Sequence, residues 1–234
     1  MESPVKDYQG LEAHRFRQRT VAHGEERART SLYHGFGLKR LMDISAALAL
    51  MALVGPVIVL FWALVRRDGG SGFYGQTRVG RGGRVFTCWK LRSMCMDAEA
   101  RLAEHLAADP TAAAEWVLSQ KLRHDPRITT VGHLIRKYSI DELPQLWNVL
   151  RGDMSLVGPR PVRDDELARY GTARAAYQSV RPGITGLWQV SGRNQISYSE
   201  RVALDRDYAA HVTFTRDLSI LLRTVRVVLR GTGH

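Results

Sequence analysis

Two adjacent carboxylates, Asp141 and Glu142, lie among basic residues in the segment RKYSIDELPQLWNVLRGDMSLVGPRP, residues 136–161. Carboxylates can hold a divalent metal ion, and an arginine can pair bidentately with a phosphate. The segment ends in GPRP at residues 158–161, where two prolines so close together stop a helix and fix a turn. Two carboxylates opposite Arg160 on such a turn indicate phosphate chemistry.

The same residues also fit an ordinary helix start. Ser139 followed by Glu142 matches a capping box, and the acids would then lie where the helix dipole favours them. Pro144 argues against Ser139 as the N-cap, because it would fall beyond the first turn. With Asp141 as the N-cap, Pro144 falls within the first turn; one longer helix kinked at Pro144 is a further arrangement. Each alternative puts the carboxylates at a helix start or a kink.

The element that precedes this segment and anchors the chain is predicted at residues 44–65. This run carries no charge, and basic pairs flank it at residues 39–40 and 66–67. As a helix it would be roughly 33 Å long, enough to cross a bilayer. Pro56 follows Gly55 at its midpoint, and basic flanks prefer the cytoplasmic side. We therefore favour a re-entrant helix that bends at Pro56, with a kinked membrane span and a buried core helix as alternatives.

The remaining elements are predicted from local signals. Residues 1–35 have a polar, basic composition without periodicity, which predicts a flexible arm. A glycine-rich turn is predicted at residues 69–83 and a short strand at 85–89. Helices are predicted at 97–122, with a break at 109–110, and at 162–177 and 198–211. An amphipathic C-terminal run follows at 218–229. The C-terminal run fits either an anionic membrane surface or a core-facing helix with a solvated edge.

Composition bounds the function. With 234 residues, 44% of them hydrophobic, the chain can bury one sizeable core. Its formal charge of +11 implies an anionic partner, either nucleic acid, anionic lipid or a phosphorylated substrate. Cys88 and Cys95 match no common zinc spacing and are expected to be reduced. No signal peptide is expected, because the first apolar run starts far from Met1.

Several motifs occur together in one order. They are KRLMD (39–43), QTRVG (76–80), KLRSM (90–94), DPRIT (125–129), SIDELPQLWNV (139–149), the segment 154–161, and RPG (181–183) with a following glycine at 186. By these motifs the chain resembles the bacterial sugar transferases, also called monotopic phosphoglycosyl transferases or polyprenol-phosphate glycosyl-1-phosphate transferases. It departs from that pattern with Gly-Pro in place of Ser-Pro at the membrane break, KLRSM in place of KFRSM, and GSGFY in place of GPxFF.

The resemblance implies an α+β, mainly helical fold: a monotopic membrane protein with a helix-break-helix re-entrant membrane helix, a small β-hairpin and interfacial amphipathic helices. It divides the chain into the arm at residues 1–35, the membrane helix at 36–68 and a catalytic domain at 69–234. That domain would lie on the cytoplasmic face of the bacterial inner membrane. Membrane lipid is an expected partner and nucleic acid is not; homo-oligomer formation is left open.

The resemblance also implies a reaction. A sugar 1-phosphate, expected to be a hexose phosphate, would pass from a UDP-sugar to undecaprenyl or another polyprenyl phosphate, with release of UMP. This would be the first membrane step of exopolysaccharide, capsule or O-antigen-type glycan synthesis. Asp141 would be the nucleophile that forms an aspartyl phospho-sugar. Asp141 and Glu142 would hold Mg²⁺. Glu142 would organise the metal or assist deprotonation of the acceptor phosphate. The phosphate contacts would come from Lys90, Arg92, Arg136 and Arg160.

Two other functions remain open at this point. A conventional membrane-associated glycosyltransferase would move only the sugar and release UDP. A non-enzymatic basic module would bind membrane or nucleic acid through its charge, but it gives the carboxylate pair at residues 141–142 no role. The nucleotide released and salt-dependent binding to DNA or RNA separate these alternatives.

Overall fold

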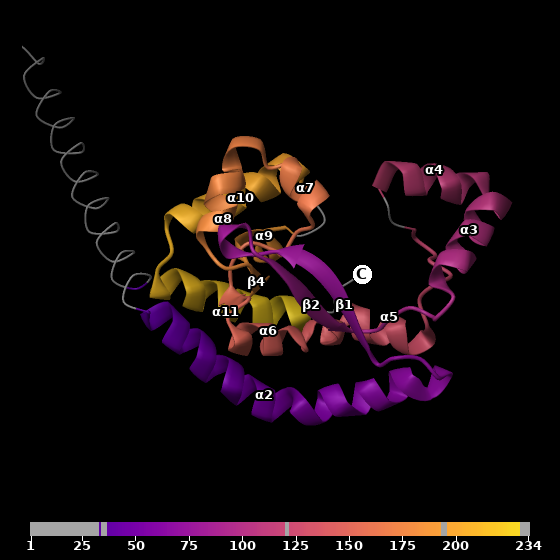
Figure 1. Cartoon of the computed structure of the whole chain (residues 1–234), viewed down its shortest axis with the longest axis horizontal. Helices are drawn as coiled ribbons and strands as arrows, with labels where there is room; N and C mark the ends of the chain where they lie inside the picture. Colours follow the sequence, from indigo (N-terminus) through magenta and orange to yellow (C-terminus); the bar gives the residue numbers. More distant parts are fainter. Residues whose placement is uncertain (1–32, 34–36, 120–121, 193–195, 230–234) are drawn as a thin grey trace, which may run out of the picture.

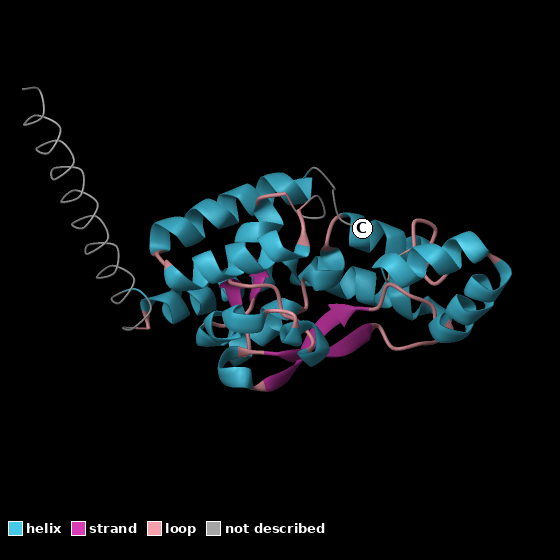
Figure 2. Ribbon diagram, turned by 90° about the horizontal axis from the view of Figure 1, so that it is seen from above, coloured by secondary structure: helices cyan, strands magenta, loops and turns pink. Residues whose placement is uncertain are grey.

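The computed structural model describes residues 33, 37–119, 122–192 and 196–229 (Figure 1). The predicted arm at residues 1–35 lies outside this part of the chain, apart from Tyr33. Helices make up most of the described chain, and strands form two small sheets (Figure 2), which confirms the expected helical fold with little β-structure.

The helices are α2 (Leu38–Val65), α3 (Ala98–Ala108), α4 (Pro110–Ser119), α5 (Thr130–Lys137), α6 (Gln145–Arg151), α7 (Asp164–Ala168), α8 (Arg174–Ser179), α9 (Leu187–Val190), α10 (Tyr198–Ala210) and α11 (Phe214–Leu229). Short 3₁₀ turns are η1 (Arg66–Asp68), η2 (Arg81–Gly83), η3 (Ile140–Glu142) and η4 (Gly171–Ala173). The strands are β1 (Phe73–Val79), β2 (Val85–Leu91), β3 (Ser155–Val157) and β4 (Gly183–Thr185).

Helix α2 contains the long apolar run. It is continuous through Pro56, so the expected helix-break-helix appears instead as one helix that changes direction along its length (Figure 1). The helix continues because a proline removes only its own backbone donor from the hydrogen-bond ladder. Only 11% of the most apolar window of residues 38–68 is buried, so α2 is not a core helix of the domain beside it. By length and composition this helix could cross a membrane.

Both ends of α2 are attached to the same domain. Near the N-terminal end, Asp43 accepts hydrogen bonds from the Ser155 hydroxyl at 3.0 Å and from the Leu156 amide at 3.1 Å. At the C-terminal end, Arg92 donates to the Val65 carbonyl at 3.1 Å and pairs with Asp68. The outward side between these attachments exposes apolar residues, including Leu48, Leu53, Val59 and Leu60.

Strands β1 and β2 form the expected hairpin, antiparallel from Phe73↔Leu91 to Val79↔Val85. Its 3₁₀ turn η2 contains Gly82 and Gly83, both at positive φ, where a side chain would be strained. Strand β2 runs to Leu91, two residues beyond the strand predicted at residues 85–89. Both cysteines are free thiols, as expected, and Cys88 is buried within β2.

A second, buried sheet pairs β3 and β4 in parallel, with Ser155 opposite Gly183 and Val157 opposite Thr185. The sequence did not predict this sheet. Around it lies the largest cluster of buried apolar side chains, which includes Leu146, Val149, Met154 and Tyr208. The helix predicted at residues 162–177 is instead three short pieces, α7, η4 and α8.

Helix α11 presents apolar side chains outward. Ile220 and Asp217 face the domain and are buried, whereas Phe214, Leu218, Leu222, Val225 and Leu229 are exposed along the other side. Arg223 turns back to the Val190 carbonyl at 2.9 Å. Because the exposed stripe is apolar rather than solvated, the structure favours the membrane-surface interpretation of this helix.

Candidate active site

The two carboxylates stand on a single 3₁₀ turn between two helices. Helix α5 ends at Lys137, Ser139 follows with a left-handed backbone at φ 56°, and η3 carries Asp141 and Glu142. Pro144, with φ −60°, then begins α6 as its N-cap. Neither Ser139 nor Asp141 therefore begins an α-helix, and no single helix runs through Pro144. Helix α5 has ended at Lys137, and α6 begins only after Pro144.

Ser139 holds a backbone conformation that a side chain disfavours. It is the one non-glycine residue with positive φ in the described chain, and its side chain makes no capping hydrogen bond. The capping-box pattern around Glu142 is therefore not formed; the capping box that does form lies at Ser197 and Glu200, at the start of α10. A non-glycine residue at positive φ costs about 1–2 kcal/mol, and such positions cluster at functional sites.

Lys90 of β2 reaches this turn from the hairpin. Its Nζ lies 2.8 Å from Glu142 Oε1 and 4.0 Å from Asp141 Oδ2. Arg160 reaches the same Glu142 oxygen from the opposite segment, with Nη1 at 3.6 Å. Four of the residues predicted from the sequence thus meet at one place, two carboxylates facing two cations.

Burial changes the acid strength of Asp141. Burial, and to a smaller degree the charge of Glu142, raise its pKa from 3.8 to about 6, although the positive charges of Lys90, Arg136 and Arg160 act in the opposite direction. Desolvation is the largest of these effects. At neutral pH the carboxylate is ionised and poorly solvated, which is the state a carboxylate nucleophile needs.

Two backbone segments in close contact fix Arg160. Gly158 donates to the Thr185 carbonyl at 2.9 Å, and Gly183 donates to the Pro159 carbonyl at 2.8 Å. A Cβ on Gly183 would lie 2.1 Å from the Gly158 nitrogen, so only glycine permits this approach. The GPRP turn is therefore held against β4, with Arg160 projecting from a rigid support.

Asn148 fixes the relative position of β2 and α6. Its side-chain amide donates to the Thr87 carbonyl at 2.7 Å, and its Oδ1 accepts from the Trp89 amide at 3.0 Å. The side chain is completely buried. These bonds hold β2 just before Lys90 and start from the helix that follows the carboxylate turn, so Asn148 ties the strand that carries Lys90 to that helix.

The other two predicted phosphate ligands have different surroundings. Arg136, in the last turn of α5, is near enough to Asp141 to lower its pKa. Arg92 is engaged elsewhere: it pairs with Asp68 and also donates to the Ser71 carbonyl at 2.6 Å and the Met94 carbonyl at 2.8 Å. The structure therefore does not bring Arg92 to the carboxylates, and its phosphate contact stays a prediction that this geometry does not support.

Sequence reasoning left Arg78 and Gln145 out of the site. Both line a small cavity of about 10 Å³ together with Lys90, Glu142 and Arg160. Burial and the adjacent charge of Arg160 lower the pKa of Arg78. A signal for Arg78 existed in the QTRVG motif, but nothing local shows that β1 ends beside the GPRP turn, where Val79 pairs with Val162.

The carboxylate turn suits a hard divalent cation only in part. No group of three or more His, Cys, Asp or Glu side chains able to hold a metal occurs within the described ranges. Mg²⁺ is commonly bound by one or two carboxylates while substrate phosphates and water complete its shell. Asp141 and Glu142 fit that arrangement, with a diphosphate substrate supplying the remaining oxygens.

Comparison with known proteins adds a family to this geometry. The family described as "Bacterial sugar transferase" matches residues 34–231. The undecaprenyl-phosphate galactose phosphotransferase of Salmonella typhimurium is 52% identical over 196 residues, which are 84% of this chain and 41% of that protein. Thus the chain spans less than half the length of this relative.

Two further relatives have lengths closer to this chain. The exopolysaccharide production protein ExoY of Rhizobium meliloti is 46% identical over 196 residues, 83% of this chain and 87% of ExoY. The UDP-glucose:undecaprenyl-phosphate glucose-1-phosphate transferase of Caulobacter vibrioides is 41% identical over 200 residues, 82% of this chain and 69% of that protein. The carboxylate turn, the hairpin and the GPRP turn all lie within the region that the family covers.

Proposed function

Because the chain belongs to the bacterial sugar transferase family, we propose that it transfers a sugar 1-phosphate from a UDP-sugar to undecaprenyl or another polyprenyl phosphate and releases UMP. Relatives named as an undecaprenyl-phosphate galactose phosphotransferase and as a UDP-glucose:undecaprenyl-phosphate glucose-1-phosphate transferase support this class of reaction. The observation that carries the proposal is the largely buried carboxylate of Asp141 beside Glu142, facing the cations of Lys90 and Arg160.

In the first half of the reaction, an Asp141 oxygen attacks the β-phosphorus of the donor. A phosphorus–oxygen bond forms to Asp141, the bond from that phosphorus to the bridging oxygen breaks, and UMP leaves with the electron pair. Lys90 and Arg160 approach the carboxylates from two sides, so they can stabilise the negative charge that builds on the phosphoryl oxygens. Arg136 adds positive charge beside Asp141.

In the second half, a phosphate oxygen of the polyprenyl phosphate attacks the phosphorus of the aspartyl phospho-sugar. The bond to Asp141 breaks, the carboxylate is regenerated, and the product is a polyprenyl diphosphate sugar. Glu142 lies next to the reacting carboxylate and can accept the proton of a monoprotonated acceptor phosphate. Bound Mg²⁺, held by Asp141 and Glu142, would neutralise charge on the donor diphosphate.

The exposed apolar surfaces suit a reaction between a soluble donor and a lipid acceptor. Helix α2 and the outer stripe of α11 can enter the lipid, and both ends of α2 return to the catalytic domain. A domain attached at both ends of one membrane helix is expected on one face only, and the basic flanks indicate the cytoplasmic face. We propose this face of the bacterial inner membrane as the site of reaction, in an early step of exopolysaccharide-type glycan synthesis.

The decisive experiment traps the covalent intermediate. Protein in nanodiscs is incubated with Mg²⁺ and UDP-galactose or UDP-glucose, without acceptor, and its peptides are examined by mass spectrometry. We expect a hexose-phosphate adduct on Asp141 that disappears when undecaprenyl phosphate is added. Product formation with no adduct on Asp141 at any time would contradict the mechanism.

A nucleotide assay with matched variants completes the test. We expect wild-type protein to release UMP and Asp141→Asn to release none. Asp164→Asn serves as the control, because that side chain is 84% exposed and lies outside the carboxylate turn. Release of UDP in place of UMP would indicate a conventional glycosyltransferase, and full activity of Asp141→Asn would exclude Asp141 as the nucleophile.

A further inference from the structure

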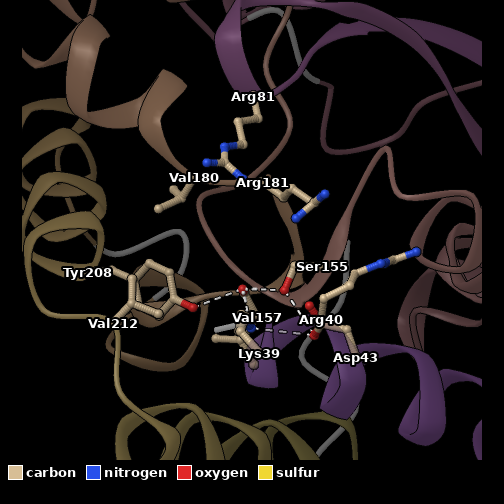
Figure 3. A pocket seen from close by; sticks show the side chains of 11 residues that line it. Lys39, Arg40, Asp43, Arg81, Ser155, Val157, Val180, Arg181, Tyr208 and Val212 are labelled. Atoms are coloured by element: carbon tan, nitrogen blue, oxygen red, sulfur yellow. Dashed lines mark hydrogen bonds and ion pairs between the residues drawn. The ribbon is translucent and has the colours of Figure 1, made fainter. Parts of the chain in front are cut away.

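A larger cavity lies at the N-terminal end of α2, apart from the carboxylate turn. Its volume is about 230 Å³, and its lining includes Lys39, Arg40, Arg81 and Arg181 but none of the residues that line the small cavity beside Glu142. Figure 3 shows Arg81 and Arg181 on one side of this cavity and Lys39, Asp43 and Ser155 on the other. Arg81 comes from the hairpin turn η2, so three separate segments of the chain supply its cations.

The three arginines of this cavity lack acidic partners in the part of the chain that the structure describes. The positive charge of Lys39 is paired with carboxylates, because its Nζ lies 3.4 Å from Asp43 and 2.7 Å from Asp217. Arg40 and Arg181 donate instead to backbone carbonyls around the end of α6, at 2.6 Å to Val149 and 2.8 Å to Gly152. Each guanidinium has five N–H donors, so these bonds leave others for a ligand.

The electrostatics of Arg181 show that like charges are held close together here. Burial and then the positive charges of Arg40 and Arg81 lower its pKa. Arg181 must therefore keep its charge in a partly desolvated place beside two other cations, and the carboxylate of Asp43 offsets this only in part. An anion in the cavity would offset both the repulsion and the lost hydration.

We propose that this cavity binds a phosphate group as a second anion site, independent of the phospho-sugar transfer reaction. Arginine guanidiniums suit phosphate because they pair with its oxygens through paired N–H donors. The cavity adjoins the first turn of the apolar helix, where Leu38 and Leu41 are exposed. With α2 in the membrane as proposed above, this position lies at the level of lipid headgroups, so an anionic phospholipid or a soluble phosphate compound can supply the group.

The test uses Arg81→Gln, with Arg84→Gln as a matched control. Arg81 is exposed and makes no ion pair among the described residues, so its replacement should not disturb folding. Arg84 is also exposed, lies in the same hairpin turn and does not line the cavity. Both variants lose one positive charge, so general surface electrostatics affects them equally.

The full chain in detergent is titrated with two probes at constant ionic strength, and its thermal unfolding midpoint is followed. Inorganic phosphate tests the soluble source. Short-chain phosphatidylglycerol, compared with short-chain phosphatidylcholine, tests the headgroup source. We expect at least one probe to raise the midpoint of wild type and Arg84→Gln, and Arg81→Gln to need about tenfold more of it, as expected for one lost charge-assisted hydrogen bond.

Each outcome bears on the proposal. Dependence on Arg81 with inorganic phosphate supports a soluble ligand, and dependence on Arg81 with phosphatidylglycerol alone supports a lipid headgroup. If neither probe changes the midpoint, or if both variants lose the response equally, the proposal is wrong. None of these results depends on sugar transfer, so failure here leaves the proposed reaction unaffected.

Discussion

At the scale of single residues, Asp141 combines burial with neighbouring charges of both signs. Burial makes the carboxylate a stronger base than an exposed aspartate, and the cations around it keep it ionised at neutral pH. A nucleophile with a pKa slightly below the working pH is both deprotonated and reactive. The acidity of Asp141 should therefore be visible in the pH dependence of the reaction.

We expect kcat/KM to rise with pH and then to level off, because only the ionised carboxylate attacks. The pKa of about 6 is that of Asp141 without metal, so Mg²⁺ held by this carboxylate would move the rise to lower pH. Lys90→Gln removes a charge that lowers this pKa, so its acidic limb should move to higher pH. Glu142→Gln removes a charge that raises it, so its limb should move to lower pH. UMP release measured between pH 5 and 8 at saturating Mg²⁺ checks both shifts, and shifts in one common direction would contradict this assignment.

The same burial should make the ionised carboxylate of Asp141 lower the free energy of unfolding. Between pH 3.8 and about 6 the folded protein keeps this proton while the unfolded chain has lost it, so stability falls as pH rises through that window. At pH 7 the charge costs at most about 3 kcal/mol. We expect Asp141→Asn to unfold at a higher temperature than wild type at pH 7, and the difference to shrink towards pH 4.

Thermal unfolding of the two proteins across this pH range measures the effect. The control variant Asp164→Asn should match wild type throughout, because its carboxylate is exposed. An Asp141→Asn protein that is less stable than wild type at pH 7 would show that contacts to the carboxylate outweigh its burial.

At the scale of elements, the site depends on pairings between segments far apart in the sequence. Helix α2, the break between α3 and α4 and the β1–β2 hairpin follow from local signals, namely an apolar run, an Asp-Pro step and a glycine-rich turn. The sheet of β3 and β4 gives no such signal. Each of its strands has three residues, and their pairing joins Ser155 to Gly183.

Local patterns also misplaced two side chains. The Ser139 and Glu142 pattern predicts a helix cap, but the preceding helix has ended and Ser139 takes a left-handed backbone instead. The family resemblance placed Arg92 beside Lys90 among the phosphate contacts. Strand β2 ends at Leu91, and Arg92 turns to Asp68 instead. In both cases a tertiary contact decides what the local pattern leaves open.

We expect Gly183→Ala to disrupt the site from within this sheet. The new Cβ would lie 2.1 Å from the Gly158 nitrogen and 2.4 Å from the Thr185 oxygen, so the GPRP turn must move away and take Arg160 with it. Overpacking of this kind typically costs about 1–3 kcal/mol. Thermal unfolding and UMP release measure the two losses.

Gly55→Ala is the matched control for this substitution. No atom lies within 4 Å of a Cβ added at Gly55, and this glycine is inside helix α2, where alanine is favoured. Its unfolding midpoint should equal or exceed that of wild type. Wild-type stability and activity in Gly183→Ala would show that the two strands can separate without cost.

At the scale of the whole molecule, the arrangement of α2 predicts its topology. Because both ends of the helix attach to one domain, single cysteines at Leu38 and Arg67, in a background with Cys88 and Cys95 replaced, should react with a membrane-impermeant maleimide from the same side. We expect labelling in inverted membrane vesicles and none in intact cells. Labelling of the two positions from opposite sides would show that α2 spans the bilayer.

Arg92 gives this architecture a mechanical consequence. Its guanidinium donates to the carbonyl of Val65, the last residue of α2, and pairs with Asp68 just beyond that helix. Arg92 also follows directly after β2, the strand that carries Lys90. Lipid packing that shifts α2 relative to the domain would therefore pull on the strand two residues from Lys90. We expect the rate of the proposed reaction to respond to lipid composition, and UMP release in nanodiscs of graded lipid packing would measure that response.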